Sequence, residues 1–315
     1  MPIIYIAGAA PGAGATAVAG GLALALRRRG VDAAAVKVAA DGDGGADARV
    51  LADALGVEDA QPLNAADADA AAEALSAAAA STGALVVDGL PLSDASVDFA
   101  ARIGARVVGV QPYGVEPADW RTAFGGALTG VLVNRRARYA EHDAATRLAP
   151  RLEAEGAPVL AVVPDDRRML AVSVSEIAEA LSADFYAWPS EGARLIDRFI
   201  IGGLIAEWGG NYFGRYPDQA VIVRGGRTDI QMAALNFPLA CLILTACEQP
   251  PQYVRQRAQA ERVPLMSVAE GTLAAAAALE ALTERAAVHH PDKLRRFADL
   301  LEGAPGWAAI EAAAA

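Results

Sequence analysis

The sequence has little cysteine, few aromatic side chains and an excess of negative charge. Its two cysteines, Cys241 and Cys247, have a spacing that is neither a metal-binding nor a redox motif, and we expect reduced thiols. Aromatic residues make up only 6% of the 315 residues and hydrophobic residues 54%, which predicts cores of small, closely packed side chains. The formal net charge of −11 disfavours nucleic acid and anionic membrane surfaces as partners.

Long apolar segments are also missing. No run approaches the roughly 20 residues that a membrane span needs, and the N-terminus enters an apolar strand at once, without a signal peptide. These absences predict a soluble, cytoplasmic protein. The length favours about two domains.

The feature that organises the chain is a glycine-rich segment near its start. Residues 3–7 are apolar, residues 8–16 read GAAPGAGAT, and an Ala/Leu-rich helical segment follows at 17–29. Strand, glycine-rich turn and helix form the context in which backbone N–H groups surround a phosphate. A phosphate loop normally carries Lys and then Ser or Thr after its last glycine. Here Thr16 is present, but Ala15 stands in the lysine position.

Apolar runs alternate with helical segments through the first half of the chain. Strands are expected at 3–7, 33–38, 84–87, 105–110, 128–133 and 159–163, with a helix at 140–155 and a flexible loop at 41–45. Continuously apolar strands of this kind predict an α/β fold, a parallel sheet covered by helices on both faces. Ligands of such sheets bind beyond the carboxyl ends of the strands. The polar residues found there are Lys37, Asp88, Asn134 and Asp165.

A second, smaller α/β unit is expected after a linker at 186–190. Strands at 220–223, 240–245 and 264–268 alternate with helical segments, and a terminal helix is expected at 291–301. We therefore expect a phosphate-loop domain at 1–185, a second domain at 190–302 and a frayed, low-complexity tail at 303–315. His289 and His290 precede a proline and are interpreted as a turn between helices.

With these residues placed, the first domain resembles dethiobiotin synthetase. It resembles more closely the dethiobiotin-synthetase-like domain at the N-terminus of long phosphotransacetylases. That family spaces its loop as Gly-x5-Gly-Lys-Thr, and Gly8 to Thr16 has this spacing with Ala15 for the lysine. The phosphotransacetylase branch commonly lacks the lysine too. The resemblance implies a P-loop NTPase-like fold.

The resemblance also implies roles for individual residues. Lys37 would be catalytic, Asn134 would hold adenine, and Pro164 would lie in the segment that closes the base pocket. Thr16, Asp47 and Asp88 would hold Mg²⁺. The loop residues implied in binding a nucleotide are Gly8, Gly12, Ala13, Gly14, Ala15, Thr16 and Ala17.

Each of these residues also has an ordinary structural interpretation. The loop can be a tight turn without a ligand, and Lys37 a solvated residue at a strand end. Asp88 before Gly89 fits a turn, Asp47 fits an exposed acid at a helix start, and Asn134 fits a turn. The sequence leaves these alternatives open.

The second domain resembles a DRTGG domain. The segments GGRTDIQMAAL, CLILT and AERVPLMSVAEGT match its pattern, although Gly226 replaces the Asp of the naming motif and Asp229-Ile230 replace its two glycines. No acyltransferase domain follows. Together, the two resemblances span about residues 2–300. They imply a stand-alone form of the regulatory region of long phosphotransacetylases.

Three functions are compatible with these features. The first is a regulatory or scaffold protein, a pseudo-enzyme that binds ATP or a related nucleotide with Mg²⁺ and has little or no turnover. Its DRTGG-like domain would mediate homodimerisation or bind a protein partner. The alternative is an active Mg²⁺-dependent ATPase or ligase of the dethiobiotin synthetase type. A third is a purely structural protein in which neither domain binds a ligand.

Overall fold

The chain forms two compact units. The computed structural model describes residues 2–40, 44–58, 60–203 and 205–314, so most of the expected loop at 41–45 lies outside the described residues. The first unit comprises residues 1–166 together with 288–315, and the second comprises residues 167–287. This division differs from the ranges expected from the sequence. Residues 167–185, expected in the first domain, belong to the second unit, and residues 288–302, expected in the second domain, belong to the first.

A parallel sheet forms the centre of the first unit. Among the described residues it has seven strands in the order β3-β2-β4-β1-β5-β6-β7, and all neighbours are parallel. The strands are β1 (Ile3–Gly8), β2 (Ala33–Ala39), β3 (Leu63–Asn64), β4 (Ala84–Asp88), β5 (Arg106–Pro112), β6 (Leu128–Arg136) and β7 (Val159–Pro164). The predicted α/β fold class, with a parallel sheet, is confirmed.

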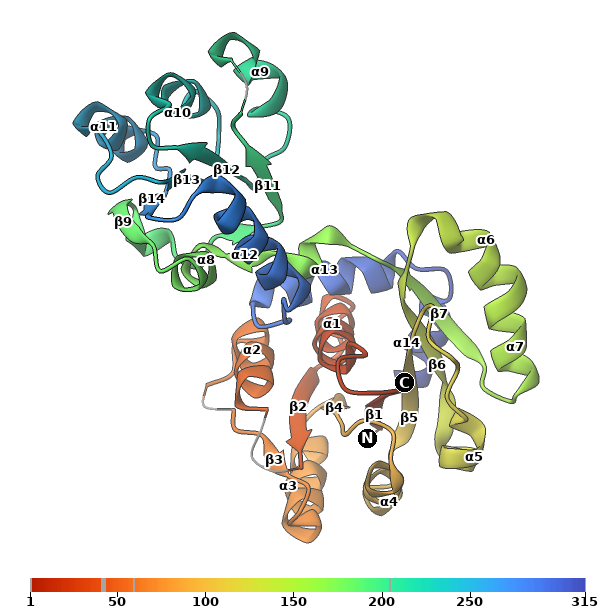
Figure 1. Ribbon diagram of the computed structural model, residues 1–315. Helices are drawn as coiled ribbons and strands as arrows, with labels where there is room; N and C mark the ends of the chain where they lie inside the picture. Colours follow the sequence, from red (N-terminus) through yellow and green to blue (C-terminus); the bar gives the residue numbers. More distant parts are fainter. Residues whose placement is uncertain (1, 41–43, 59, 204, 315) are drawn as a thin grey trace. The chain divides into compact units, whose positions relative to one another are not determined.

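Helices cover both faces of this sheet (Figure 1). They are α1 (Ala15–Arg28), α2 (Gly45–Leu55), α3 (Ala68–Ala80), α4 (Asp94–Arg102), α5 (Trp120–Phe124), α6 (Glu141–Asp143), α7 (Ala149–Ala154), α13 (Pro291–Glu302) and α14 (Trp307–Ala314). On one face Tyr5 and Val87 pack with Phe99 of α4 and Trp120 of α5, all of them buried. Helices α1 and α2 contact the sheet through β2, and α1 also contacts β4. The strands are therefore buried on both sides, as their apolar runs predict.

The second unit contains a smaller sheet. Its five strands, counted within the described residues, have the order β11-β12-β13-β14-β9, and β9 alone is antiparallel to its neighbour. The strands are β9 (Asp184–Ala187), β11 (Arg198–Ile201), β12 (Gln219–Arg224), β13 (Cys241–Thr245) and β14 (Leu265–Val268), and β8 (Val172–Ser173) pairs with β10 (Leu195–Ile196). The helices are α8 (Val174–Ala180), α9 (Gly209–Tyr212), α10 (Thr228–Ala234), α11 (Gln252–Ala260) and α12 (Thr272–Glu284). The expected second α/β unit is thus present.

Several local features differ from the sequence-based expectation. Helix α4 was not expected; the Ser93 side chain caps it by accepting a hydrogen bond from the backbone N–H of Ser96. The helix expected at 140–155 is interrupted by a π-helical turn at 144–148. The tail expected to be frayed contains α14, where Trp307 and Ile310 are buried. Within the described residues, no helix combines the length and the apolar character needed to cross a membrane.

Two adjacent glycines allow α13 to pack closely on α1. A Cβ at Gly20 would lie 2.7 Å from Leu294 Cδ1, and one at Gly21 would lie 2.8 Å from Phe297 Cδ1. Figure 1 shows α13, in blue, beside α1, in red. Glycine within a helix costs about 0.5–1 kcal/mol relative to alanine, and here it makes room for buried Leu294 and Phe297. The last helices therefore complete the core of the first unit.

The contribution of α13 can be measured with Leu294→Ala. Leu294 is fully buried against Val50 and Leu51 of α2, so we expect the free energy of unfolding to fall by about 2–5 kcal/mol. Urea denaturation followed by fluorescence gives this value. Leu300→Ala, at a half-buried position of the same helix, is the matched control and should cost clearly less. Equal losses in the two variants would contradict the assigned packing.

Candidate functional site

The glycine-rich loop joins β1 to α1. Gly12 and Gly14 have φ angles of +77° and +100°, in the left-handed region that glycine adopts at little cost. Gly14 is the N-cap of α1; it provides no side-chain cap, and the first turn of the helix contains no acidic residue. The first N–H groups of a 14-residue helix thus face this loop without an internal anion. The arrangement suits a phosphate group, as the sequence predicts.

Asn134, at the end of β6, holds the loop in place. Its Nδ2 donates a hydrogen bond to the carbonyl oxygen of Ala13 at 3.0 Å, and its Oδ1 accepts one from the N–H of Arg135 at 2.9 Å. A Cβ on Gly14 would overlap the Asn134 amide, so glycine is also required there by packing. Asn134 is buried, and its amide is engaged with the loop. Its role as an adenine-binding residue stays a prediction.

A half-buried lysine joins two carboxylates beside the loop. Lys37 Nζ lies 3.0 Å from Asp88 Oδ2 and 3.1 Å from Asp47 Oδ2. Lys37 and Asp88 are register partners at the ends of the parallel neighbours β2 and β4, which brings their side chains together. Asp47 reaches the same ammonium group from the first turn of α2. The Thr16 side chain is also a hydrogen-bonding neighbour of Asp88, and this lowers the pKa of the Asp88 carboxyl group. The structure therefore brings together the four polar residues Thr16, Lys37, Asp47 and Asp88.

Burial and charge act in opposite directions in this cluster. Complete burial raises the pKa of Asp88, although Lys37 and Thr16 act against the rise. Burial alone would lower the pKa of Lys37, but the two carboxylates outweigh it and the pKa is raised. Burial likewise opposes ionisation of Asp47, yet His289 and Lys37 lower its pKa to about 2. The lysine is thus held as an ammonium group by its carboxylate partners.

Asp88 retains one unused acceptor. Its Oδ1 is buried and has no hydrogen-bond partner among the residues that the structure describes. A buried carboxylate oxygen without a partner is costly, and a ligand donor or a hard cation would satisfy it. Within the same described residues, no group of three or more His, Cys, Asp or Glu side chains is arranged to hold a metal ion. Mg²⁺ at Thr16, Asp47 and Asp88 would therefore also need phosphate or water ligands.

His289 is a member of the cluster that the sequence does not reveal. Its Nε2 lies 3.3 Å from Asp47 Oδ1, although 242 residues separate the two in the chain. The sequence shows only a histidine pair before a proline, which is typical of a turn. Its proximity to Asp47 follows from the packing of α13 against α2 within the first unit. No local signal in the sequence points to this contact.

The other expected site residues lie at the same edge of the sheet. Gly8 ends β1, and its carbonyl oxygen accepts a hydrogen bond from the N–H of Leu92 at 2.8 Å. Pro164 ends β7 opposite Arg136 of β6. Ala17 is buried in the first turn of α1. The structure thus assigns Gly8 and Pro164 to the carboxyl edge, where the sequence predicts the binding site.

Comparison with known proteins identifies one domain. Residues 176–282 match the model of the DRTGG domain, so the second unit contains such a domain. The chain also resembles solved structures over about half of its length. The CBS and DRTGG domains of the regulatory region of Clostridium perfringens pyrophosphatase, complexed with its activator diadenosine tetraphosphate, match with 13% identity over 49% of this chain and 74% of that chain, at a TM-score of 0.34.

Two further solved structures match this chain at a similar level. The MinC:MinD cell division protein complex of Aquifex aeolicus matches with 16% identity over 54% of this chain and 84% of that chain, at a TM-score of 0.43. The signal recognition particle 54 kDa protein of Aeropyrum pernix K1, solved in complex with GDP, matches with 18% identity over 51% of this chain and 41% of that chain, at a TM-score of 0.40.

The contribution of Asp47 to stability should depend on pH. Its pKa falls from 3.8 to about 2 on folding, so its charge stabilises the folded state above pH 4, and this contribution is lost as the pH falls towards 2. Asp47→Asn should therefore be less stable than the wild type at pH 7, with a difference that shrinks below pH 4. Urea denaturation between pH 3 and pH 7 measures this difference. Asp53→Asn, at an exposed position of the same helix, is the control. If the stability difference between Asp47→Asn and the wild type were the same at every pH, the charge of Asp47 would not be the cause of that difference.

Proposed function

We propose that the protein binds a nucleoside triphosphate of the ATP type at residues 8–16 and acts as a regulatory or scaffold protein with little or no turnover. The observation that carries the proposal is the position of Lys37. The loop has glycines and a helix N-terminus suited to phosphate, while Ala15 removes the loop ammonium group. The neighbouring ammonium group, Lys37, is bound by two carboxylates.

Binding would rely on the backbone and on Thr16. The N–H groups at the start of α1 would contact the phosphates. Where Mg²⁺ is bound, Thr16, Asp47 and Asp88 would be its protein ligands, and the unused Oδ1 of Asp88 fits a hard cation. Asn134 and Pro164 would lie beside the base. Because Lys37 already balances both carboxylates, a cation there competes with Lys37.

Low turnover follows from the distribution of charge. Phosphoryl transfer depends on positive charge placed where negative charge develops in the transition state. The lysine that normally supplies it from the loop is absent, and the charge of Lys37 is offset by Asp47 and Asp88. Binding survives this loss more readily than catalysis, because the backbone donors are unaffected.

A second candidate function is an active Mg²⁺-dependent ATPase or ligase of the dethiobiotin synthetase type. It is favoured by the meeting of Thr16, Lys37 and Asp88 in one cluster. In this function Lys37 would leave its carboxylates and act as the catalytic residue on the transferred phosphoryl group. Under either function we propose a cytoplasmic protein whose DRTGG domain mediates homodimerisation or binds a protein partner.

Calorimetric titration tests the binding proposal. We expect saturable binding of ATP that depends on Mg²⁺, and we expect Ala15→Lys to bind ATP about tenfold or more tightly, because it restores a charge-assisted contact. Ala101→Lys adds the same charge at an exposed position of α4 and should leave the affinity unchanged. Equal affinities in Ala15→Lys and the wild type would show that the loop does not hold phosphates in this way.

Phosphate release separates the two candidate functions. The regulatory proposal predicts no release of phosphate from ATP above the background of a protein-free sample, even where ATP binds. Release that Lys37→Met abolishes without loss of ATP binding would favour the enzyme. Circular dichroism of the variant confirms that it is folded, since Lys37→Met also leaves Asp88 without its ion-pair partner.

A further inference from the structure

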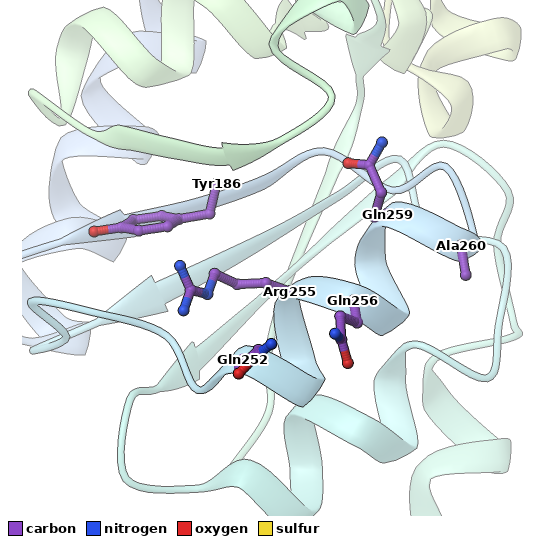
Figure 2. Close-up of a pocket in the computed structure, with 6 residues that line it drawn as sticks. All are labelled: Tyr186, Gln252, Arg255, Gln256, Gln259 and Ala260. Atoms are coloured by element: carbon purple, nitrogen blue, oxygen red, sulfur yellow. The ribbon is translucent and has the colours of Figure 1, made fainter.

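The second unit carries a shallow pocket of about 560 Å³ between β9 and α11 (Figure 2). Tyr186 of β9 lines one side. The rest of the lining comes from α11: Gln252, Arg255, Gln256, Gln259 and Ala260. The pocket lies within the residues that match the DRTGG domain and contains no residue of the phosphate loop. Its size is in the range of small-molecule sites.

A β-bulge directs Tyr186 into this pocket. Ala187 pairs with Leu265 and Phe185 pairs with Met266, so β9 has one residue, Tyr186, more than β14 at this point. Bulges at sheet edges re-aim a side chain and interrupt the edge. The Tyr186 hydroxyl donates a hydrogen bond to the carbonyl oxygen of Glu248 at 2.8 Å, which fixes the direction of the ring. The ring is therefore held in place as one wall of the pocket.

Arg255 brings a positive charge to the same wall. Its Cζ lies 5.9 Å from the centroid of the Tyr186 ring, and Figure 2 shows the guanidinium group pointing towards Tyr186. Its Nε is buried without a hydrogen-bond partner, and in the part of the chain that the structure describes no carboxylate forms an ion pair with it. The guanidinium group of arginine is planar and permanently charged. Without a carboxylate partner, its N–H donors are available to a phosphate or carboxylate group of a ligand.

Three glutamines provide neutral donors and acceptors. Gln252, Gln256 and Gln259 are exposed and spaced four and three residues apart, so they project from one face of α11. An amide side chain offers both a donor and an acceptor, the combination that reads the edge of a nucleobase. The pocket thus combines an aromatic ring, a cation and amides around one space.

We propose that this pocket binds a nucleoside monophosphate with an adenine base. The phosphate is held by Arg255, the base stacks on Tyr186, and the glutamine amides bind the base edge. An extended peptide is the weaker occupant, because the bulge at Tyr186 interrupts the edge to which a peptide strand would pair. The site is independent of the nucleotide site proposed at residues 8–16.

Titration of the full chain with AMP tests this site. We expect saturable binding that Arg255→Leu weakens at least tenfold, while adenosine, which lacks the phosphate, binds the variant and the wild type equally. Arg257→Leu is the matched control, because it removes the same charge from the same helix. Arg257 forms an ion pair with Glu261 and does not line the pocket, so this variant should leave the AMP affinity unchanged. Hydrogen exchange should show AMP protecting peptides around 184–188 and 252–260.

A second variant guards against misfolding of the first. Gln256→Glu changes an exposed side chain and adds a negative charge to the pocket, so it should weaken AMP binding severalfold, and more at low salt. AMP binding that neither variant changes, protection confined to the first unit, or no saturable binding would each overturn the proposal. None of these results affects the site at residues 8–16, which is tested by ATP and Ala15→Lys.

Discussion

The ion pair between Lys37 and Asp88 is the interaction on which the first unit depends. Asp88 is completely buried at the end of β4, and a buried carboxylate without a counter-ion is strongly unfavourable. The parallel register of β2 and β4 supplies Lys37, and α2 adds Asp47 as a second partner. Removing one partner from a buried pair typically costs about 3–5 kcal/mol. The same charges that stabilise the sheet edge therefore restrict the lysine nearest the phosphate loop.

Asp47 extends this network to the C-terminal segment of the first unit. It contacts Lys37 through one carboxylate oxygen and His289 through the other. A ligand that draws Lys37 away from Asp47 changes the charge that faces His289, just before α13. The glycine-rich loop is supported from the opposite direction by Asn134. The candidate site is thus held by residues from β2, β4, β6, α2 and the segment that precedes α13, and only its loop is local in sequence.

The sequence predicts the parts of this structure that depend on local pattern. Continuously apolar strands predict the parallel sheet, and polar residues near strand ends predict that Lys37, Asp88 and Asn134 lie at its carboxyl edge. The contact between His289 and Asp47 is not predictable in this way, because it depends on how α13 packs against α2. Helix α4 was missed because it is short and its start depends on a single capping serine, Ser93. The bulge at Tyr186 is likewise set by pairing with β14, which no local pattern encodes.

The packing of α13 on Gly20 and Gly21 has a consequence for biosynthesis. The second unit is inserted between the two segments of the first, so the ribosome makes residues 167–287 before it makes α13. Domains tend to fold as units during synthesis, starting from the N-terminus. Here the N-terminal segment emerges without the helix that covers α1, and its glycine face stays open to solvent during that interval. The ribosome therefore has to synthesise the second unit before the core of the first unit can be completed by α13.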